Sequence, residues 1–334
     1  MTQLGFVAIG RNEGARLKSC LNSLPDGAPV VYVDSGSTDG SAEWARRQGA
    51  LVVELDTSTP FSAARARNEG FACLAAEHPD VALVHFIDGD CELLPDWVGK
   101  ALARLDAEPK LAVVAGRRVE RYPEASWYNT LCAIEWDTPV GEAAAVGGDA
   151  IYRASAFREV GGFDPAMMAG EEPELCFRLR ATGYAVERID ADMTLHDAAI
   201  TSFAAWWKRA VRSGYAYTLG AMKHGRAGYN LREVARAALW GGALPAAAIL
   251  LLLVGWGWAT LAIIALYAVK WLRIRRRFRG RIRRPGRYAV FMMMTNIAEV
   301  FGIIRALVEM VRGERRILEY KTIGPAPKAK EGST

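Results

Sequence analysis

The sequence predicts an α/β domain with a mostly parallel central sheet, followed by C-terminal helices that associate with a membrane. Three observations predict it. Short apolar runs alternate with helical stretches in the first part of the chain, a long apolar stretch follows later, and a run of arginines comes directly after that stretch. The chain has 334 residues, 51% hydrophobic and 24% charged, which excludes a disordered protein.

The first 110 residues read as four strands alternating with four helices. We expect strands at 5–10, 29–36, 50–55 and 82–90, and helices at 14–23, 41–48, 62–77 and 95–107. This βαβαβαβ order predicts a parallel sheet covered by helices on both faces. Ligands of such sheets bind beyond the carboxyl ends of the strands. Polar side chains that follow these strand ends are Arg11, Asn12, Glu13, Asp34, Asp88 and Asp90.

The residues after these strands differ from those of known phosphate-binding loops. No GxGxxG follows the first strand, where the sequence is IGRNEG, and no GxxxxGK[ST] occurs in the chain. Asp88 and Asp90 instead place two carboxylates one residue apart at a strand end. Such a pair can hold Mg²⁺ or Mn²⁺, which prefer carboxylate and phosphate oxygens.

The most apolar part of the chain predicts a membrane hairpin at 241–272. As one helix these 32 residues would measure about 48 Å, against a hydrocarbon core of about 30 Å. A Gly-Trp-Gly-Trp sequence at 255–258 suits a turn in the middle. A hairpin also returns the nine arginines of 273–287 to the side of the N-terminal domain. A shallow re-entrant pair of helices remains the alternative.

The positive charge is concentrated at the C-terminal end. Residues 237–334 hold 17 Lys and Arg against 5 Asp and Glu, a net charge of +12, whereas the preceding residues have a net charge of −7. Because the arginine loop at 273–287 adjoins an apolar stretch and few aromatic residues interrupt it, we expect anionic lipids as its partner and no nucleic acid.

The remaining segments complete the predicted organisation. We expect one domain over 1–220, a connecting amphipathic segment at 221–240, an interfacial or membrane helix at 288–312, and a loose tail at 313–334. The first residues have no signal-peptide pattern, and the five cysteines show neither metal-finger nor disulfide spacing. The N-terminal domain is therefore expected in the cytoplasm, at the inner membrane.

Four motifs carry a resemblance to a known family. They are VDSGSTDGS at 33–41, FSAARARNEG at 61–70, FIDGD at 86–90 and VGGFDPAMMAGEEPELCFRLRATGY at 160–184. In this order they resemble the motifs of family 2 inverting glycosyltransferases with the GT-A fold. The resemblance implies a nucleotide-sugar donor, a divalent metal ion, Mn²⁺ or Mg²⁺, and direct displacement with inversion. Ser35 departs from the family, which usually has a second Asp there.

The resemblance also implies a role for individual residues. Glu172 aligns with the catalytic base, although the family usually has Asp there, and Glu171 stands beside it. The metal would be held by Asp88, Asp90 and His196. The nucleotide would contact Arg11, Asn12, Glu13, Asp34, Arg67 and Asp88. The donor or acceptor sugar would contact Trp136, Gly148 and Asp149.

The expected reaction transfers one sugar from a nucleotide diphosphate sugar, a UDP-sugar in the favoured case. The acceptor is a hydroxyl of a lipid-linked glycan at the cytoplasmic membrane face. The product is expected to enter cell-surface or exopolysaccharide synthesis. The Q-x-x-R-W motif of processive synthases is absent from FAAWWKRAV at 203–211, which favours single additions. One alternative is a polyprenyl-phosphate sugar synthase, which would need basic residues where Glu172 lies. The other is an inactive membrane scaffold, which would have lost the carboxylates.

Overall fold

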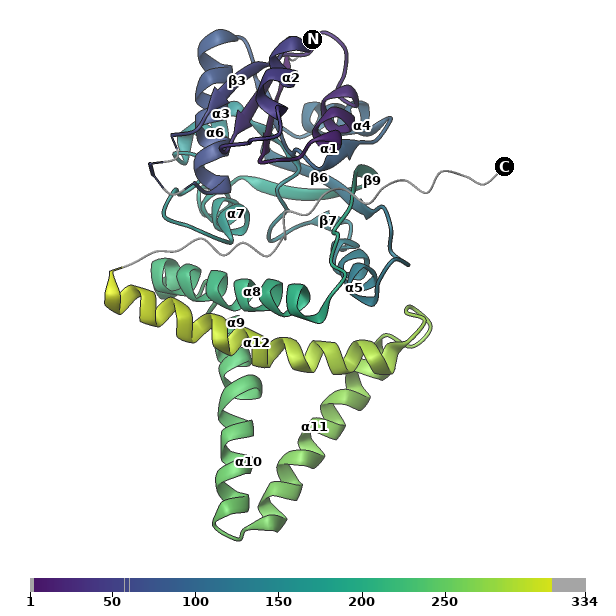
Figure 1. The fold of residues 1–334 in the computed structure, drawn as a ribbon, viewed down its shortest axis with the longest axis vertical. Helices are drawn as coiled ribbons and strands as arrows, with labels where there is room; N and C mark the ends of the chain where they lie inside the picture. The colour runs from purple at the N-terminus through teal and green to yellow at the C-terminus, as the bar shows by residue number, and fades with distance from the viewer. Residues whose placement is uncertain (1–2, 57, 60, 314–334) are drawn as a thin grey trace. The chain divides into compact units, whose positions relative to one another are not determined.

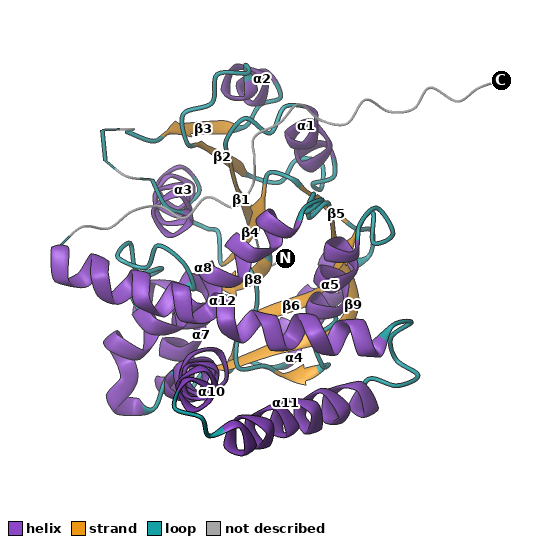
Figure 2. Ribbon diagram, turned by 60° about the horizontal axis from the view of Figure 1, so that its bottom comes forward, coloured by secondary structure: helices purple, strands orange, loops and turns teal. Residues whose placement is uncertain are grey.

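The computed structural model describes residues 3–56, 58–59 and 61–313, which form two compact units that meet in the chain at Thr201 and Ser202. The first unit is built on a mixed sheet (Figures 1 and 2). Its nine strands among the described residues are β1 (Leu4–Gly10), β2 (Val30–Asp34), β3 (Leu51–Glu54), β4 (Leu83–Asp88), β5 (Cys91–Leu93), β6 (Leu111–Glu120), β7 (Gly141–Glu142), β8 (Ala150–Arg153) and β9 (Ala185–His196).

The helices of this unit connect the strands and pack on the sheet, with α3 on β1 and β2 and α4 on β6 and β9. They are α1 (Ala15–Asn22), α2 (Ser41–Arg47), α3 (Ala63–Glu77), α4 (Trp97–Ala107), α5 (Trp127–Trp136), α6 (Ala154–Glu159) and α7 (Glu171–Ala181). The four strands and four helices expected in the first 110 residues are all present, within two residues at most of their ends.

The sheet is mixed, which corrects the expectation of a mostly parallel sheet: β1 to β4 are parallel neighbours and β6 pairs with β9 in parallel, but the other pairs are antiparallel. The strand order is β3-β2-β1-β4-β8-β6-β9-β5, and β8 runs antiparallel between β4 and β6. Strand β8 begins at the edge where β4 ends, so it must run in the opposite direction. This reversal places Asp149, the residue before β8, beside the carboxyl end of β4.

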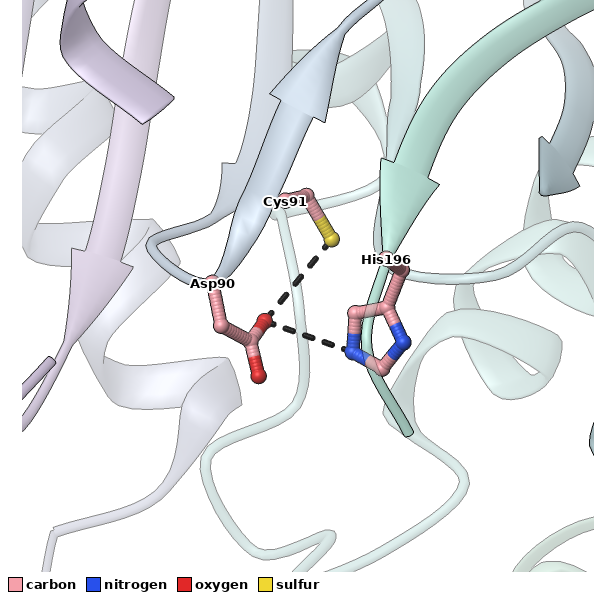
Figure 3. Close-up of side chains that lie close together, drawn as sticks. All are labelled: Asp90, Cys91 and His196. Carbon is pink, nitrogen blue, oxygen red and sulfur yellow. Dashed lines mark hydrogen bonds and ion pairs between the residues drawn. The ribbon is translucent and has the colours of Figure 1, made fainter. Parts of the chain in front are cut away.

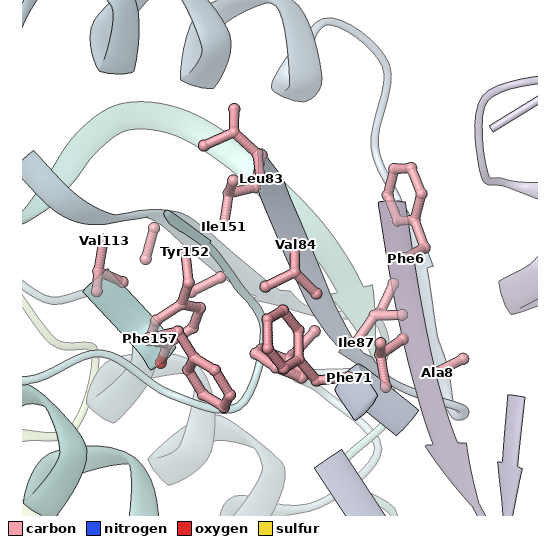
Figure 4. Packing of buried hydrophobic residues seen from close by; sticks show 14 of the residues in the cluster. Phe6, Ala8, Phe71, Leu83, Val84, Ile87, Val113, Ile151, Tyr152 and Phe157 are labelled. Atoms are coloured by element: carbon pink, nitrogen blue, oxygen red, sulfur yellow. The ribbon is translucent and has the colours of Figure 1, made fainter. Parts of the chain in front are cut away.

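The core of the first unit lies between the sheet and its helices (Figure 4). Phe86, Phe157 and Phe163 pack with ring centroids 5.3 to 5.4 Å apart. Burial of a side chain of this size stabilises the fold by about 1.5–3 kcal/mol. Helix α3 approaches the strands closely at Gly70, where an added Cβ would lie 2.4 Å from Val7 Cγ1. This contact fixes the position of α3 and of the side chains at its start.

The second unit is entirely helical among its described residues (Figure 1). It consists of α8 (Phe203–His224), a 3₁₀ turn (Gly225–Ala227), α9 (Leu231–Ala237), a π-helical segment (Ala238–Ala243), α10 (Leu244–Leu253), α11 (Gly257–Arg277) and α12 (Pro285–Arg312). Three stretches have the length and composition of membrane-crossing helices, namely Leu231–Leu253, Gly257–Arg277 and Pro285–Arg312.

The expected boundary at residue 220 falls inside α8, which belongs to the second unit. Helix α8 begins where Ser202 caps it by accepting a hydrogen bond from Ala205 N, and it then packs along α12. Glycines let the two backbones meet, because a Cβ on Gly214 would lie 2.1 Å from Glu299 O and one on Gly302 would lie 2.1 Å from Val211 O. The structure therefore begins the second unit at residue 202.

The helical hairpin is longer than the expected 241–272. Its first arm begins at Leu231, within the expected connecting segment 221–240, because α9, the π-helical segment and α10 run on without a break. Its second arm continues to Arg277, so only 278–284 of the expected basic loop at 273–287 is non-helical, and the third helix begins at Pro285 rather than 288. Arginine is a good helix former, which explains the extension. The expected tail lies outside the described residues from 314 onward.

Candidate active site

The carboxyl ends of β1, β2 and β4 meet at one edge of the sheet, as the sequence predicts. At the first two ends, side chains hold the loop at 36–40. Asp34 accepts hydrogen bonds from Gly36 N at 3.0 Å and Ser37 N at 2.7 Å. Asn12, in the left-handed conformation with φ +54°, accepts one from Thr38 N at 2.8 Å. Both polar groups shape this loop in the structure, and their contact with a nucleotide base stays a prediction.

Arg11 and Glu13 lie beside the same strand end. The guanidinium of Arg11 stacks over the ring of Phe61, 4.8 Å from its centroid, and Glu13 forms a 2.6 Å ion pair with Arg16. Both residues are partly exposed. They line the edge of the site, where the sequence places the nucleotide.

Arg67 lies at the centre of the site and connects three carboxylates. Its guanidinium is 2.9 Å from Asp88 Oδ1, 3.1 Å from Glu171 Oε1 and 3.2 Å from Glu172 Oε1. The residue is 2% exposed, and its Cζ lies 5.5 Å from the ring centroid of Phe163. The sequence assigned Arg67 to the donor phosphates, but in the structure its charge holds three acidic side chains in place.

Glu172 has the electrostatic environment that a general base needs near neutral pH. Burial, together with the adjacent charge of Glu171, raises the pKa of Glu172 to about 7, although Arg67 opposes the shift. A base with a pKa near the working pH is both deprotonated and able to accept a proton. Glu171 is 3% exposed and paired with Arg67, so it is a buried residue of the cluster.

Gly148 and Asp149 enter the site from the antiparallel strand β8. Asp149 is fully buried, and its carboxylate accepts hydrogen bonds from Asp88 N at 3.1 Å and Thr194 Oγ1 at 2.8 Å. Gly148 leaves room for the neighbouring charges, because an added Cβ would lie 2.2 Å from Arg67 Nη2. The absence of a side chain at 148 thus serves the ion pairs of Arg67, a reason that the sequence did not reveal.

We expect Gly148→Ala to destabilise the protein by about 1–3 kcal/mol, because the methyl group overpacks a filled site and displaces Arg67 from its carboxylates. Thermal denaturation of the purified protein measures this loss. Gly99→Ala is the matched control, since Gly99 lies in α4 with no atom within 4 Å of the added Cβ. Alanine should stabilise that helix by about 0.5–1 kcal/mol. Equal stability of Gly148→Ala and wild type would contradict the packing argument.

Asp90 and His196 meet through the pairing of β5 with β9, in which Cys91 lies opposite His196 (Figure 3). His196 Nε2 is 3.3 Å from Asp90 Oδ1, and both side chains are almost fully buried. Burial, with a smaller effect of Arg118, lowers the pKa of His196 to about 4. The imidazole is therefore neutral at pH 7, the form that binds a metal ion.

These residues fit the divalent cation that the family implies. Carboxylate and imidazole are suitable ligands for Mn²⁺, and two ligand atoms 3.3 Å apart fit the first shell of an ion with bonds of about 2.0–2.2 Å. In addition, His196 Nδ1 is buried without a hydrogen-bond partner among the described residues. Burial raises the pKa of Cys91, so its thiol stays protonated and is a poor ligand.

The third predicted metal ligand, Asp88, points elsewhere in the structure. Its two carboxylate oxygens face Arg67 at 2.9 Å and Arg118 at 3.3 Å. The Arg118 guanidinium is also 2.9 Å from Asp149 Oδ2. Two cationic side chains therefore already neutralise the charge of Asp88 that a metal would use. The geometry brings Asp90 and His196 together, whereas Asp88 lies beside Asp149, and Cys91 is close to both pairs. A metal contact of Asp88 stays a prediction.

Trp136, which the sequence assigned to a sugar, lies against His196. Its ring lies edge-on to His196 with centroids 4.8 Å apart, and Arg118 Cζ lies 5.6 Å from the Trp136 ring centroid. The ring is partly exposed at the end of α5. It both orients His196 and leaves a surface that a sugar can contact.

Sequence reasoning missed two groups of residues. The first is Arg118, which follows Arg117 in an otherwise apolar strand. Two arginines in an apolar strand are a signal of a buried or paired charge. The second is Glu120 with Asn129. Glu120 accepts hydrogen bonds from Asn129 Nδ2 at 3.1 Å and Ala198 N at 3.0 Å, which ties the chain after His196 to α5. No local pattern distinguishes this pair.

The cluster as a whole carries a negative charge. It contains two arginines and four carboxylates, namely Arg67, Arg118, Asp88, Asp149, Glu171 and Glu172. With every group ionised the net charge is −2. Such a site attracts a divalent cation and repels an unaccompanied phosphate.

Comparison with known proteins finds a family match. Residues 9–161 match the family described as Glycosyl transferase family 2. The chain is 29% identical over 203 residues to the pre-mycofactocin glycosyltransferase of Mycobacterium tuberculosis, which covers 56% of this chain and 41% of that protein. It is 29% identical over 196 residues to the succinoglycan biosynthesis protein ExoA of Rhizobium meliloti. This alignment covers 54% of this chain and 58% of that protein. The chain thus spans about half the length of these curated relatives.

A solved structure shares the fold. It is the mannosyltransferase PcManGT from Pyrobaculum calidifontis in complex with GDP-Man and Mn²⁺, with a TM-score of 0.56 and 20% sequence identity, covering 90% of this chain and 87% of that chain. At this identity the likeness shows the GT-A fold, which confirms the predicted fold class.

Proposed function

The chain carries a glycosyl transferase family 2 domain over residues 9–161, and from this premise we propose that it is an inverting glycosyltransferase. It transfers a single sugar from a nucleotide diphosphate sugar, a UDP-sugar in the favoured case, to a hydroxyl of a lipid-linked glycan at the cytoplasmic membrane face. The product enters cell-surface or exopolysaccharide synthesis, which the name of the succinoglycan biosynthesis relative supports.

One observation carries the proposal, namely the partly buried carboxylate of Glu172 with its pKa raised to about 7, held beside Arg67 at 3.2 Å. In an inverting transfer a base removes the proton of the acceptor hydroxyl while that oxygen attacks the anomeric carbon from the face opposite the leaving group. The bond from the anomeric carbon to the diphosphate oxygen breaks as the new glycosidic bond forms. Glu172 receives the proton in this step.

The other residues of the site position the reactants. Arg67 orients the Glu172 carboxylate and keeps it from rotating away, and Arg118 does the same for Asp88 and Asp149. Asp90 and His196 would hold the divalent ion, whose charge neutralises the diphosphate leaving group. The neighbour solved with GDP-Man and Mn²⁺ supports a nucleotide sugar and this class of metal.

The same charges disfavour the polyprenyl-phosphate sugar synthase as the function. That acceptor is a phosphate, which needs no strong base, and four carboxylates of the cluster stand against two arginines. Arg67 does lie beside Glu172, but three carboxylates already neutralise it. An inactive scaffold is disfavoured because every carboxylate of the proposed mechanism is present and placed at one edge of the sheet.

The substrate class is tested with purified full-length protein in detergent. A thermal-shift screen of UDP-, GDP- and dTDP-sugars with Mn²⁺ identifies the donor, since a ligand of the folded state raises the melting temperature by mass action. Nucleotide release is then measured with lipid-linked glycans and with polyprenyl phosphate. Release stimulated only by the hydroxyl acceptor supports the proposal. Release stimulated only by polyprenyl phosphate would replace it with the synthase.

The rate of transfer should rise with pH through about 7 and level off above about 8, because only the deprotonated Glu172 accepts a proton. A profile of kcat/KM at saturating Mn²⁺ measures this. The stability that Glu172 contributes to the folded protein changes with pH in the opposite direction to the rate. The pKa of Glu172 is higher in the folded protein than the usual value of 4.5 for this side chain, so stability is lost as pH rises from 4.5 through 7. A rate independent of pH between 6 and 8 would contradict the assignment.

A further inference from the structure

The helical hairpin of the second unit has an uncharged part that is bounded by charged residues. No Asp, Glu, Lys or Arg occurs in the 33 residues 237–269, which end at Arg236 on one side and Lys270 on the other. The hairpin side chains near its turn are strongly exposed, with Leu253 at 78%, Trp258 at 73% and Leu261 at 65%. Large exposed apolar side chains without charges are typical of contact with lipid.

The charged end of the first arm is held at α12, and that of the second arm is held at the first arm. Arg236 donates to Asn296 Oδ1 at 2.7 Å and forms a 2.9 Å ion pair with Glu299, both on α12. On the other arm, Lys270 Nζ lies over the ring of Trp240, 4.0 Å from its centroid.

Further contacts hold the base of the hairpin together. The Tyr267 hydroxyl donates to Trp240 O, which joins α11 to the π-helical segment, and Trp271 Nε1 donates to Gly286 O at 3.0 Å, which joins α11 to α12. The uncharged parts of the two arms therefore both begin at the base of the hairpin, next to α12.

Helix α12 has the pattern of a helix that lies in the membrane surface. Its exposed apolar side chains recur at spacings of four and three residues, at Ile297, Phe301, Ile304, Val308 and Val311. Charged residues of the same helix, Arg305 and Glu309, form a 2.8 Å ion pair. Figure 1 shows α8 and α12 running across the base of the hairpin, with α10 and α11 converging from this base to the turn. The base thus belongs at the headgroups, near the nine arginines of 273–287.

The whole helices of the hairpin have the length of a membrane crossing, but the uncharged part of the shorter arm does not reach across a bilayer from that base. The uncharged part of α11 is residues 257–269, and these 13 residues measure about 20 Å as a helix. The hydrocarbon core is about 30 Å thick and a crossing needs about 20 apolar residues, whereas 10–14 are typical of re-entrant segments. Because the arms incline toward each other, the depth of the turn is less than the length of the shorter arm.

Three backbone N–H groups of the turn are paired within the protein. The N–H groups of Val254, Gly255 and Trp256 all donate to carbonyl oxygens of the preceding helix, at 2.8 to 3.2 Å. Between the arms, Thr260 Oγ1 donates to Ala248 O at 3.1 Å. Unpaired backbone donors are the main cost of a turn in hydrocarbon, and these three are satisfied.

We propose that the hairpin enters the bilayer from one face and turns back inside the hydrocarbon core without reaching the opposite headgroups. The partner of this surface is a lipid bilayer with anionic headgroups on the side of the arginines. The protein is thereby anchored in one face of the membrane, and both ends of the hairpin stay on that face. This inference does not depend on the proposed reaction.

The depth of the turn is measured with full-length protein in vesicles of phosphatidylcholine and phosphatidylglycerol. A nitrobenzoxadiazole dye is attached to Trp258→Cys in a Cys73→Ser background, because Cys73 is the only native cysteine that is not buried. Leu261→Cys repeats the measurement one turn away, should the first variant misfold. Gly280→Cys, in the exposed loop after α11, is the matched control.

We expect spin-labelled lipids to quench the dye at 258 and 261 most strongly when the label is at the end of the acyl chain. A membrane-impermeant maleimide applied to both sides should label Gly280→Cys and leave both turn variants unlabelled until detergent is added. Strongest quenching by headgroup labels, or labelling of either turn variant, would show that the turn reaches water and would overturn the proposal.

Discussion

Glu172→Gln should lower kcat by roughly 10²- to 10⁴-fold, the usual contribution of a general base. Glutamine keeps the size of the side chain and its contact with Arg67, but it cannot accept the proton of the acceptor hydroxyl. Donor binding should therefore change little. The measurement is nucleotide release at saturating donor and Mn²⁺, with and without acceptor, and the rise of activity through pH 7 should disappear with the variant.

Glu171→Gln is the matched control, because it removes the neighbouring carboxylate of the same cluster. Glu171 is buried and lies 3.1 Å from Arg67, so its loss should reduce stability, while kcat should fall by less than about tenfold. If Glu171→Gln is inactive and Glu172→Gln is active, Glu171 is the base. If both variants stay active, a phosphate acceptor that needs no base explains the site better.

Asp90→Asn should reduce turnover below detection, a loss of more than about 10³-fold, because charge neutralisation at the diphosphate by a metal ion is worth several kcal/mol. Asparagine preserves the shape of the side chain and can still accept a hydrogen bond from His196 Nε2, so the variant should fold. Binding of Mn²⁺ to the protein, followed by electron paramagnetic resonance, should weaken in parallel. This second readout does not depend on turnover.

Cys91→Ala is the control for Asp90→Asn. Cys91 lies in the same cluster, with Sγ 3.7 Å from Asp90 Oδ1, but its thiol stays protonated and should not bind the ion. That variant should keep its affinity for Mn²⁺. Full wild-type activity in EDTA, or unchanged Mn²⁺ binding by Asp90→Asn, would remove the metal from the mechanism.

Local patterns in the sequence were sufficient for the first half of the fold. Strands such as β1 and β4 are short apolar runs followed by polar residues, and α3 begins at a Ser cap, so each is determined by residues close in the chain. The same applies to the hairpin, whose turn at Gly255 follows from glycine in the left-handed conformation, φ +82°. The residues at the ends of parallel strands meet at one edge because the sheet geometry requires it.

The arrangement within the site could not be predicted in the same way. Arg67 and Glu171 are 104 residues apart, and their ion pair exists because α3 and α7 both begin at the same edge of the sheet. Asp149 lies beside Asp88 only because β8 is antiparallel, and neither residue's neighbours in sequence show that direction. The depth of the hairpin likewise depends on where Arg236 and Lys270 meet α12 and Trp240.

The sequence by itself determined the strands and helices of the first 110 residues, the family resemblance and most of the acidic and basic side chains that the site uses, because periodicity, caps and motifs are properties of neighbouring residues. Only the tertiary structure decided which charges pair. Arg67 and Arg118 are held by carboxylates from strands and helices far apart in the chain, while Asp90 and His196 are brought together by the register of β5 on β9. Pairing at these distances follows from strand order and packing, which no local pattern encodes.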